Sequence, residues 1–169
     1  MLSQIKNTIK DIENSKDYQD WHSKNKSSYL CSAFLISENI NEINTGWQID
    51  YYNPEDSKIT SFIMIGNSLQ IMPPEEVFQK EKTKIKELNL NDIKIDLNKA
   101  IETSKKLIKD KYKNENPDKI IVVLQVLEAI LWNITYLTST FNIINIKINA
   151  IDNEILADSL TSVMSFKQK

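Results

Sequence analysis

The amino-acid sequence predicts an α+β protein built from two similar units, each a helix packed on a curved antiparallel β-sheet. Two observations predict this class. Amphipathic helical patterns begin near residues 3 and 96, and an apolar strand pattern follows each of them. Residues 47–65, "WQIDYYNPEDSKITSFIMI", and residues 132–150, "WNITYLTSTFNIINIKINA", then each show two alternating strands around a turn.

The first unit is predicted over residues 1–77. Isoleucines at helical spacing predict a helix from about residue 3 to residue 20, and the apolar segment 27–37 predicts a largely buried strand. Two strands then flank the turn-forming sequence "NPEDS", and the meander continues through "LQIM". It stops at Pro73-Pro74, because proline cannot donate a ladder hydrogen bond. Pro74, Glu75 and Glu76 resemble the first turn of a short helix.

A connection and a second unit follow. Residues 78–92 are rich in lysine and glutamate, which predicts a solvated connection. In the unit 93–169, Asp96 is placed to cap a helix that runs to about residue 112. "KIIVVLQVL" then predicts a buried strand, and "LWNITYL" and "NIINIKINA" predict a hairpin. The last segment, "ILADSLTSVMSF", predicts either a strand or a short helix.

The two hairpins align without a gap. A shift of 85 residues places Trp47 on Trp132, and the further matches are Ile49 with Ile134, Tyr51 with Tyr136, Ile59 with Ile144 and Ile63 with Ile148. The order helix, strand, strand, strand therefore occurs twice, which predicts an internal duplication. Trp47 and Trp132 are expected on the same face of the sheet.

Residues 92–160 carry a pattern that resembles the PepSY family. The pattern is an alanine-containing helix, a strand, a Trp-initiated strand, and a strand that ends in an acidic turn before a small apolar tail. Its positions here are Ala100, Trp132, Ile148, Asp152 and Leu156, with Asn153-Glu154 where Asp-Thr-Gly-Glu is typical. The resemblance implies a cystatin-like fold, in tandem if the duplication holds, and an association with extracytoplasmic or membrane-linked proteins and peptidase inhibition. It implies no catalytic residues.

Composition argues against several function classes. The formal net charge is −2 and every one of the 21 basic residues is a lysine, so no guanidinium is available for bidentate recognition, and nucleic acid is not expected as a partner. The single cysteine, Cys31, cannot form an intramolecular disulfide, and the N-terminal segment lacks the apolar core of a signal peptide. A cytoplasmic location is expected. No apolar run is long enough to predict a membrane span.

Few residues suggest catalysis. His22 is the only histidine, so a His22–Cys31 pair is the one conceivable base and nucleophile, but Cys31 lies in an apolar strand where a thiol is usually buried. The carboxylates Asp50, Glu55 and Asp56 at the first turn, and Asp152 and Glu154 at the second, are interpreted as turn residues without the spacing of a calcium loop. Two glycines exclude a phosphate-cradling loop. No catalytic residue, cofactor or metal site is predicted.

The aromatic residues favour core packing over a stacking platform, because Trp47, Tyr51, Trp132 and Tyr136 share a strand face with isoleucines. Tyr52 lies on the opposite face and is the one candidate binding residue. The predicted function is a non-catalytic binding or scaffolding module that acts through an exposed sheet face or an edge strand, with a protein partner or a second copy. The alternative is a small-ligand-binding protein or an enzyme with its site in the concave face of the sheet.

Overall fold

The computed structural model describes residues 1–43, 46–77 and 84–164. The first half contains the helices α1 (Leu2–Asn14) and α2 (Lys16–Lys24) and the strands β1 (Tyr29–Ser37), β2 (Gln48–Asn53), β3 (Lys58–Ile65), β4 (Ser68–Ile71) and β5 (Glu75–Glu76). The second half contains a 3₁₀ turn (Leu90–Asp92), the helix α3 (Leu97–Lys111) and the strands β6 (Pro117–Val126), β7 (Ile130–Thr138), β8 (Asn142–Asn149) and β9 (Ile155–Ser162). The class is α+β, as the sequence predicts.

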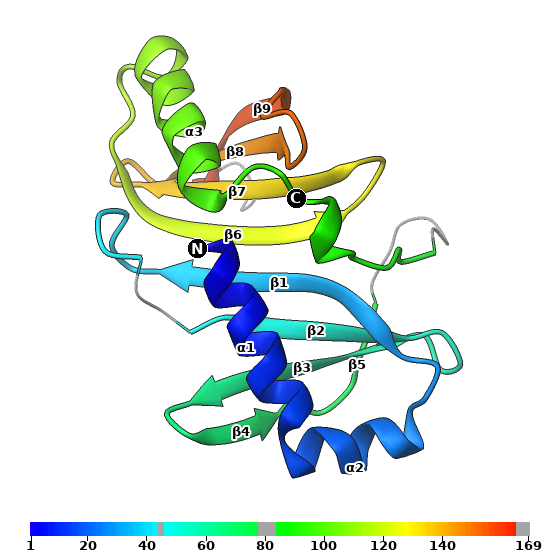
Figure 1. Ribbon diagram of the computed structural model, residues 1–169. Coiled ribbons are helices and arrows are strands. Elements are labelled where there is room, and N and C mark those ends of the chain that lie inside the picture. The colour runs from blue at the N-terminus through cyan, green and yellow to red at the C-terminus, as the bar shows by residue number, and fades with distance from the viewer. Residues whose placement is uncertain (44–45, 78–83, 165–169) are drawn as a thin grey trace.

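One antiparallel sheet contains the strands of both halves. Its order is β4-β3-β2-β1-β6-β7-β8-β9, and β5 pairs with β3. The first strands of the two halves, β1 and β6, pair with each other from Ser32↔Gln125 to Ser37↔Ile120. Figure 1 shows α1 over the strands of the first half and α3 over those of the second, both on the same side of the sheet. Of the predicted connection 78–92, residues 78–83 lie outside the described part of the chain.

The core lies between the helices and one face of the sheet. Trp47 and Trp132 both belong to it, with 4% and 0% of their surfaces exposed, so the two tryptophans share a face as expected. The helices contribute buried residues at helical spacing, namely Ile5, Ile9 and Ile12 from α1 and Leu97, Ala100, Ile101 and Ile108 from α3. The described residues place no helix on the other face of the sheet (Figure 1).

Three local features differ from the sequence expectation or decide between its alternatives. The helix expected over residues 3–20 is two helices, because Ser15 has extended backbone angles and its hydroxyl accepts a hydrogen bond from the Tyr18 amide, which makes it the N-cap of α2. The short helix expected from Pro74 is wrong. Glu75 and Glu76 instead pair with β3 as the short strand β5. The last segment is the strand β9.

The gapless alignment of the two hairpins is also wrong beyond the first strand of each. Tyr51 pairs with Thr60, whereas Tyr136 pairs with Ile144, so Thr60 is the counterpart of Ile144. The cause is the turn, which is one residue longer between β2 and β3 than between β7 and β8. A slip of one residue exchanges the faces of a strand. The longer turn between β2 and β3 therefore removes the predicted matches of Ile59 with Ile144 and of Ile63 with Ile148.

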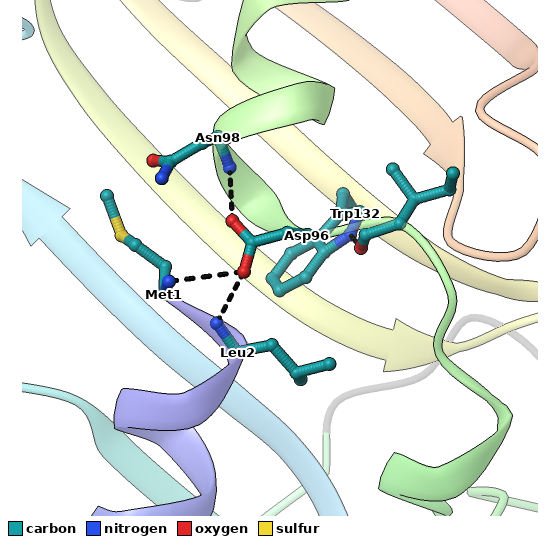
Figure 2. Close-up of polar contacts among 6 residues, drawn as sticks. Met1, Leu2, Asp96, Asn98 and Trp132 are labelled. Atoms are coloured by element: carbon teal, nitrogen blue, oxygen red, sulfur yellow. Dashed lines mark hydrogen bonds and ion pairs between the residues drawn. The ribbon is translucent and has the colours of Figure 1, made fainter.

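One carboxylate ties the starts of α1 and α3 together (Figure 2). Asp96 accepts hydrogen bonds from the amides of Asn98 at 2.9 Å and Leu2 at 2.8 Å, and from the α-amino group of Met1 at 3.1 Å. Burial acts to raise the pKa of Asp96, but these donors outweigh it and lower the pKa below its ordinary value. Beside this contact, the indole N–H of Trp132 donates to the carbonyl oxygen of Ile95 at 2.9 Å. The predicted cap of α3 is thus also a joint between the two halves.

Candidate functional site

The candidate site is the sheet face that carries no helix, called here the helix-free face. Strand pairing assigns its side chains, since neighbours across a ladder point to the same side. Over β1, β2, β3, β6, β7 and β8 only three charged side chains point to this face, Asp50, Lys119 and Lys147. Lys119 forms an ion pair with Glu38. Glu75 of β5, which pairs with Ile59, adds a fourth charge at the edge of this face. Over the six central strands the helix-free face is therefore poor in charge, although 26% of the whole sequence is charged.

An apolar band crosses the centre of the helix-free face, where the two halves of the sheet meet. It consists of two cross-strand pairs, Phe34 with Val123 and Ile36 with Ile121. Ile36 is 45% exposed, and the other three side chains are half-buried. The four side chains are therefore neighbours on one side of the β1–β6 ladder.

A hydrogen-bonded network around Asp50 flanks the apolar band on the first half. Asp50 is 7% exposed, and its carboxylate accepts hydrogen bonds from the Ser32 and Ser61 hydroxyls, both at 2.7 Å, and from the Gln48 amide at 2.9 Å. Among the described residues no ion pair involves Asp50. Hydrogen bonds therefore stabilise this carboxylate without a cation. Asp50 belongs to β2, so its interpretation as a turn residue is wrong.

A second network occupies the equivalent place on the other half. The Asn145 amide donates to the Asn133 side-chain oxygen at 2.7 Å and to the Thr135 hydroxyl at 2.8 Å. Thr135 lies opposite Asn145 in the β7–β8 ladder, and Asp50 lies opposite Ser61 in the β2–β3 ladder. The two networks therefore occupy matching positions in the two ladders. This second network contains no charge.

Cys31 and His22 lie on opposite sides of the sheet. His22 stacks on Tyr18, whose ring belongs to the core under the helices. Cys31 lies in a bulge of β1 and lines a hollow of about 530 Å³ on the helix-free face, where its thiol donates to the carbonyl oxygen of Asp50 at 3.3 Å. Burial, with the Asp50 charge as a smaller cause, raises the pKa of Cys31 to about 12. The thiol is therefore protonated at neutral pH and is not an activated nucleophile.

The other residues that the sequence singles out are placed as follows. Tyr52 does lie on the helix-free side, but it is 8% exposed and its ring packs edge-on against Tyr29. The Tyr29 hydroxyl donates to the carbonyl oxygen of Ile85, so the segment after residue 84 covers this end of the face. Asp56 and Asp152 accept hydrogen bonds from amides two residues onward, as turn residues do.

Sequence reasoning missed Asp50 as the centre of a network. The available signal was alternation, since Asp50 is out of phase with Trp47, Ile49 and Tyr51 and must point away from the core. In the described part of the chain no three His, Cys, Asp or Glu side chains are grouped so that they could hold a metal ion. No described helix has both the length and the apolar composition needed to cross a bilayer.

Comparisons with known proteins show a similarity of fold alone. No family model matches the chain, and no curated protein matches its sequence. Among solved structures, the fold is similar to that of a crystal structure from Clostridium difficile 630 described as a "putative lipoprotein". The TM-score is 0.50 and the sequence identity 15%, over 85% of this chain and 90% of that one.

Proposed function

We propose that the chain is a non-catalytic binding module that docks a protein through its helix-free face, and that the docked protein is a second copy of the same chain. The observation that carries the proposal is the composition of the helix-free face. Depletion of charge around a partly exposed apolar centre is typical of the core of a protein interface.

The polar networks fit this use. Desolvation of a polar group at an interface costs free energy unless the group is already hydrogen-bonded. The carboxylate of Asp50 and the side chains of Asn133 and Thr135 are bonded within their own networks. A flat partner could therefore cover them without breaking these bonds.

A second copy suits this face by symmetry. The apolar band lies on the β1–β6 joint, with one polar network on each side. A two-fold axis through the band would place band against band, as an isologous dimer requires. Two sheets packed face to face in this way interdigitate the side chains of their facing surfaces.

The test is light scattering over a concentration series with matched variants. We expect a concentration-dependent dimer, and we expect Ile36→Lys to raise its dissociation constant by about tenfold or more, because a lysine would be desolvated at the centre of the interface. The control is Phe141→Lys, which replaces a 72% exposed side chain in the β7–β8 turn and should leave the dimer unchanged. A monomer up to about 200 μM, or equal effects of both variants, would contradict the proposal.

The resemblance to the PepSY family extends the proposal to modulation of a peptidase. Its support is the Trp132 strand packed under the Ala100 face of α3, together with the acidic turn at Asp152. A non-catalytic role is supported by the protonated thiol of Cys31 and by its separation from His22. The cytoplasmic location stays a prediction, which cell fractionation tests.

A further inference from the structure

A second surface, on the helix side of the sheet, has the features of a small-ligand site. It is a groove of about 510 Å³ between α3 and the loop after β1. Its apolar lining comes from Ile40 in the loop, Ile108 on α3, Tyr112 at the C-cap of α3, Pro117 at the start of β6 and Tyr136 on β7. Ile108 and Tyr136 are buried at its floor, so Ile40, Tyr112 and Pro117 supply the accessible apolar surface. The volume falls within the range of small-ligand pockets.

The rim of the groove is positively charged. Lys105, Lys109 and Lys113 line it, and all three are exposed. Lys105 and Lys109 are four residues apart on α3, which is about 6 Å along the helix axis, and Lys113 follows the C-cap of the helix. These three side chains are called here the lysine row. Among the described residues none of the three belongs to an ion pair, whereas Lys99, Lys111 and Lys119 pair with Glu102, Asp158 and Glu38.

One carboxylate, that of Glu115, also lines the groove. It accepts hydrogen bonds from Thr140 at 2.8 Å and from Asn142 at 2.9 Å, which lower its pKa below the ordinary value. These bonds connect it to Thr140 in the β7–β8 turn and to Asn142 at the start of β8. Three positive charges and one negative charge therefore line the groove, with a net excess of positive charge.

We propose that this groove binds an organic anion with an apolar body, such as a medium-chain carboxylate. The apolar lining would take the body of the ligand, and the lysine row would take its charge. Lysine suits a single anionic head in variable orientations, because an ammonium is a point charge without the fixed fork of a guanidinium. The inference concerns a different surface from the proposed dimer interface and does not depend on it.

The lysines have a competing structural explanation. Cations near a helix C-terminus stabilise the negative end of the helix dipole, and Lys109 lies in the last turn of α3. That role would make the lysines matter for stability and not for ligand binding. The test must therefore measure both quantities on the same variants.

The experiment measures binding of decanoate, below its micelle concentration, by calorimetry, with anilinonaphthalene sulfonate fluorescence as a second probe. The groove variant carries Lys105→Gln, Lys109→Gln and Lys113→Gln. The control carries Lys10→Gln, Lys16→Gln and Lys24→Gln, which replaces three exposed lysines on α1 and α2 and changes the net charge equally. Thermal melts of both variants show whether they remain folded.

We expect saturable binding with one site, and a dissociation constant that rises about tenfold in the groove variant and by less than about twofold in the control. Ile40→Glu, which places a carboxylate in the lining, should weaken binding at least as much. Added salt should weaken binding to the unaltered protein more than to the groove variant. Absence of saturable binding, or equal losses in both lysine variants, would overturn the inference.

Discussion

Tyr51 and Tyr136 occupy the same place in the two halves of the sheet, yet they bond different partners. The Tyr51 hydroxyl donates to the exposed Glu13 of α1 at 2.8 Å, and the Tyr136 hydroxyl lies 2.5 Å from the buried Ser104 hydroxyl of α3. Burial raises the pKa of both phenols, that of Tyr136 to about 12. Each tyrosine thus links its strand to the helix above it, through a charged partner in the first half and a neutral one in the second.

The helix-free face repeats this difference. The network around Asp50 holds a carboxylate, while the network of Asn133, Thr135 and Asn145 at matching ladder positions is neutral. Similar backbones can therefore carry different chemistry at equivalent positions, provided that each polar group finds a hydrogen-bond partner. The first half is accordingly expected to be the more sensitive to charge removal.

The largest expected change in stability comes from removing the two core tryptophans, and it tests whether both halves share one core. Trp47→Ala and Trp132→Ala should each lower the free energy of unfolding by about 3 to 5 kcal/mol through the cavity that they leave. The loss should be greater for Trp132, which also donates a hydrogen bond to Ile95. Urea denaturation followed by circular dichroism measures both, and one transition is expected because a single sheet spans the halves. A loss below about 1 kcal/mol at either site, or two separate transitions, would contradict a shared core.

The next effect sharpens the contrast between the two networks. Asp50→Ala removes the acceptor for Ser32, Gln48 and Ser61 together and should cost about 2 kcal/mol. Thr135→Ala should cost only about 0.5 to 1 kcal/mol, because the Asn145 amide keeps its bond to Asn133. Denaturant midpoints of the two variants measure the difference. Equal losses of stability in the two variants would mean that the charged carboxylate of Asp50 contributes no more than the neutral hydroxyl of Thr135.

A further effect, smaller than that of Asp50→Ala, concerns the joint between the halves. Asp96→Ala should cost about 1 kcal/mol at neutral pH, the usual value of an N-cap. Because the folded pKa of Asp96 is lowered, its contribution is complete above its ordinary pKa of 3.8 and is lost as pH falls through the lowered value. Unfolding free energies of the unaltered protein and the variant, measured from pH 7 down to about pH 3, should therefore converge. A constant difference across this range would contradict the role of the ionised carboxylate.

Much of the fold could be predicted from local pattern. Alternation located β2, β3, β7 and β8, dense apolar segments located β1 and β6, and helical spacing located α1 and α3. The helix break at Ser15 and the one-residue difference between the hairpin turns were not predicted. Ser15 breaks the helix through extended backbone angles and its side-chain cap, which the apolar spacing does not reveal. Positive φ angles at Ser57 and Phe141 occur in the two hairpin turns without the glycine that would have signalled them.

Asn153 shows the same limit in the segment that resembles the PepSY family. It stands in the turn before β9 with a φ of 69°, a conformation that favours glycine and that asparagine tolerates better than most residues. An asparagine can therefore supply the backbone geometry that the missing glycine would provide. The presence of an asparagine in the sequence does not by itself show that this position has a positive φ angle.

By itself, the sequence determined the α+β class, the two similar helix and strand orders, and the shared face of Trp47 and Trp132, because these depend on periodicity within short segments. Only the tertiary structure decided that β1 pairs with β6 in one continuous sheet, that three side chains donate hydrogen bonds to Asp50, and that Lys105, Lys109 and Lys113 border a groove. These features join residues far apart in the chain, and local periodicity carries no information about which distant segments meet.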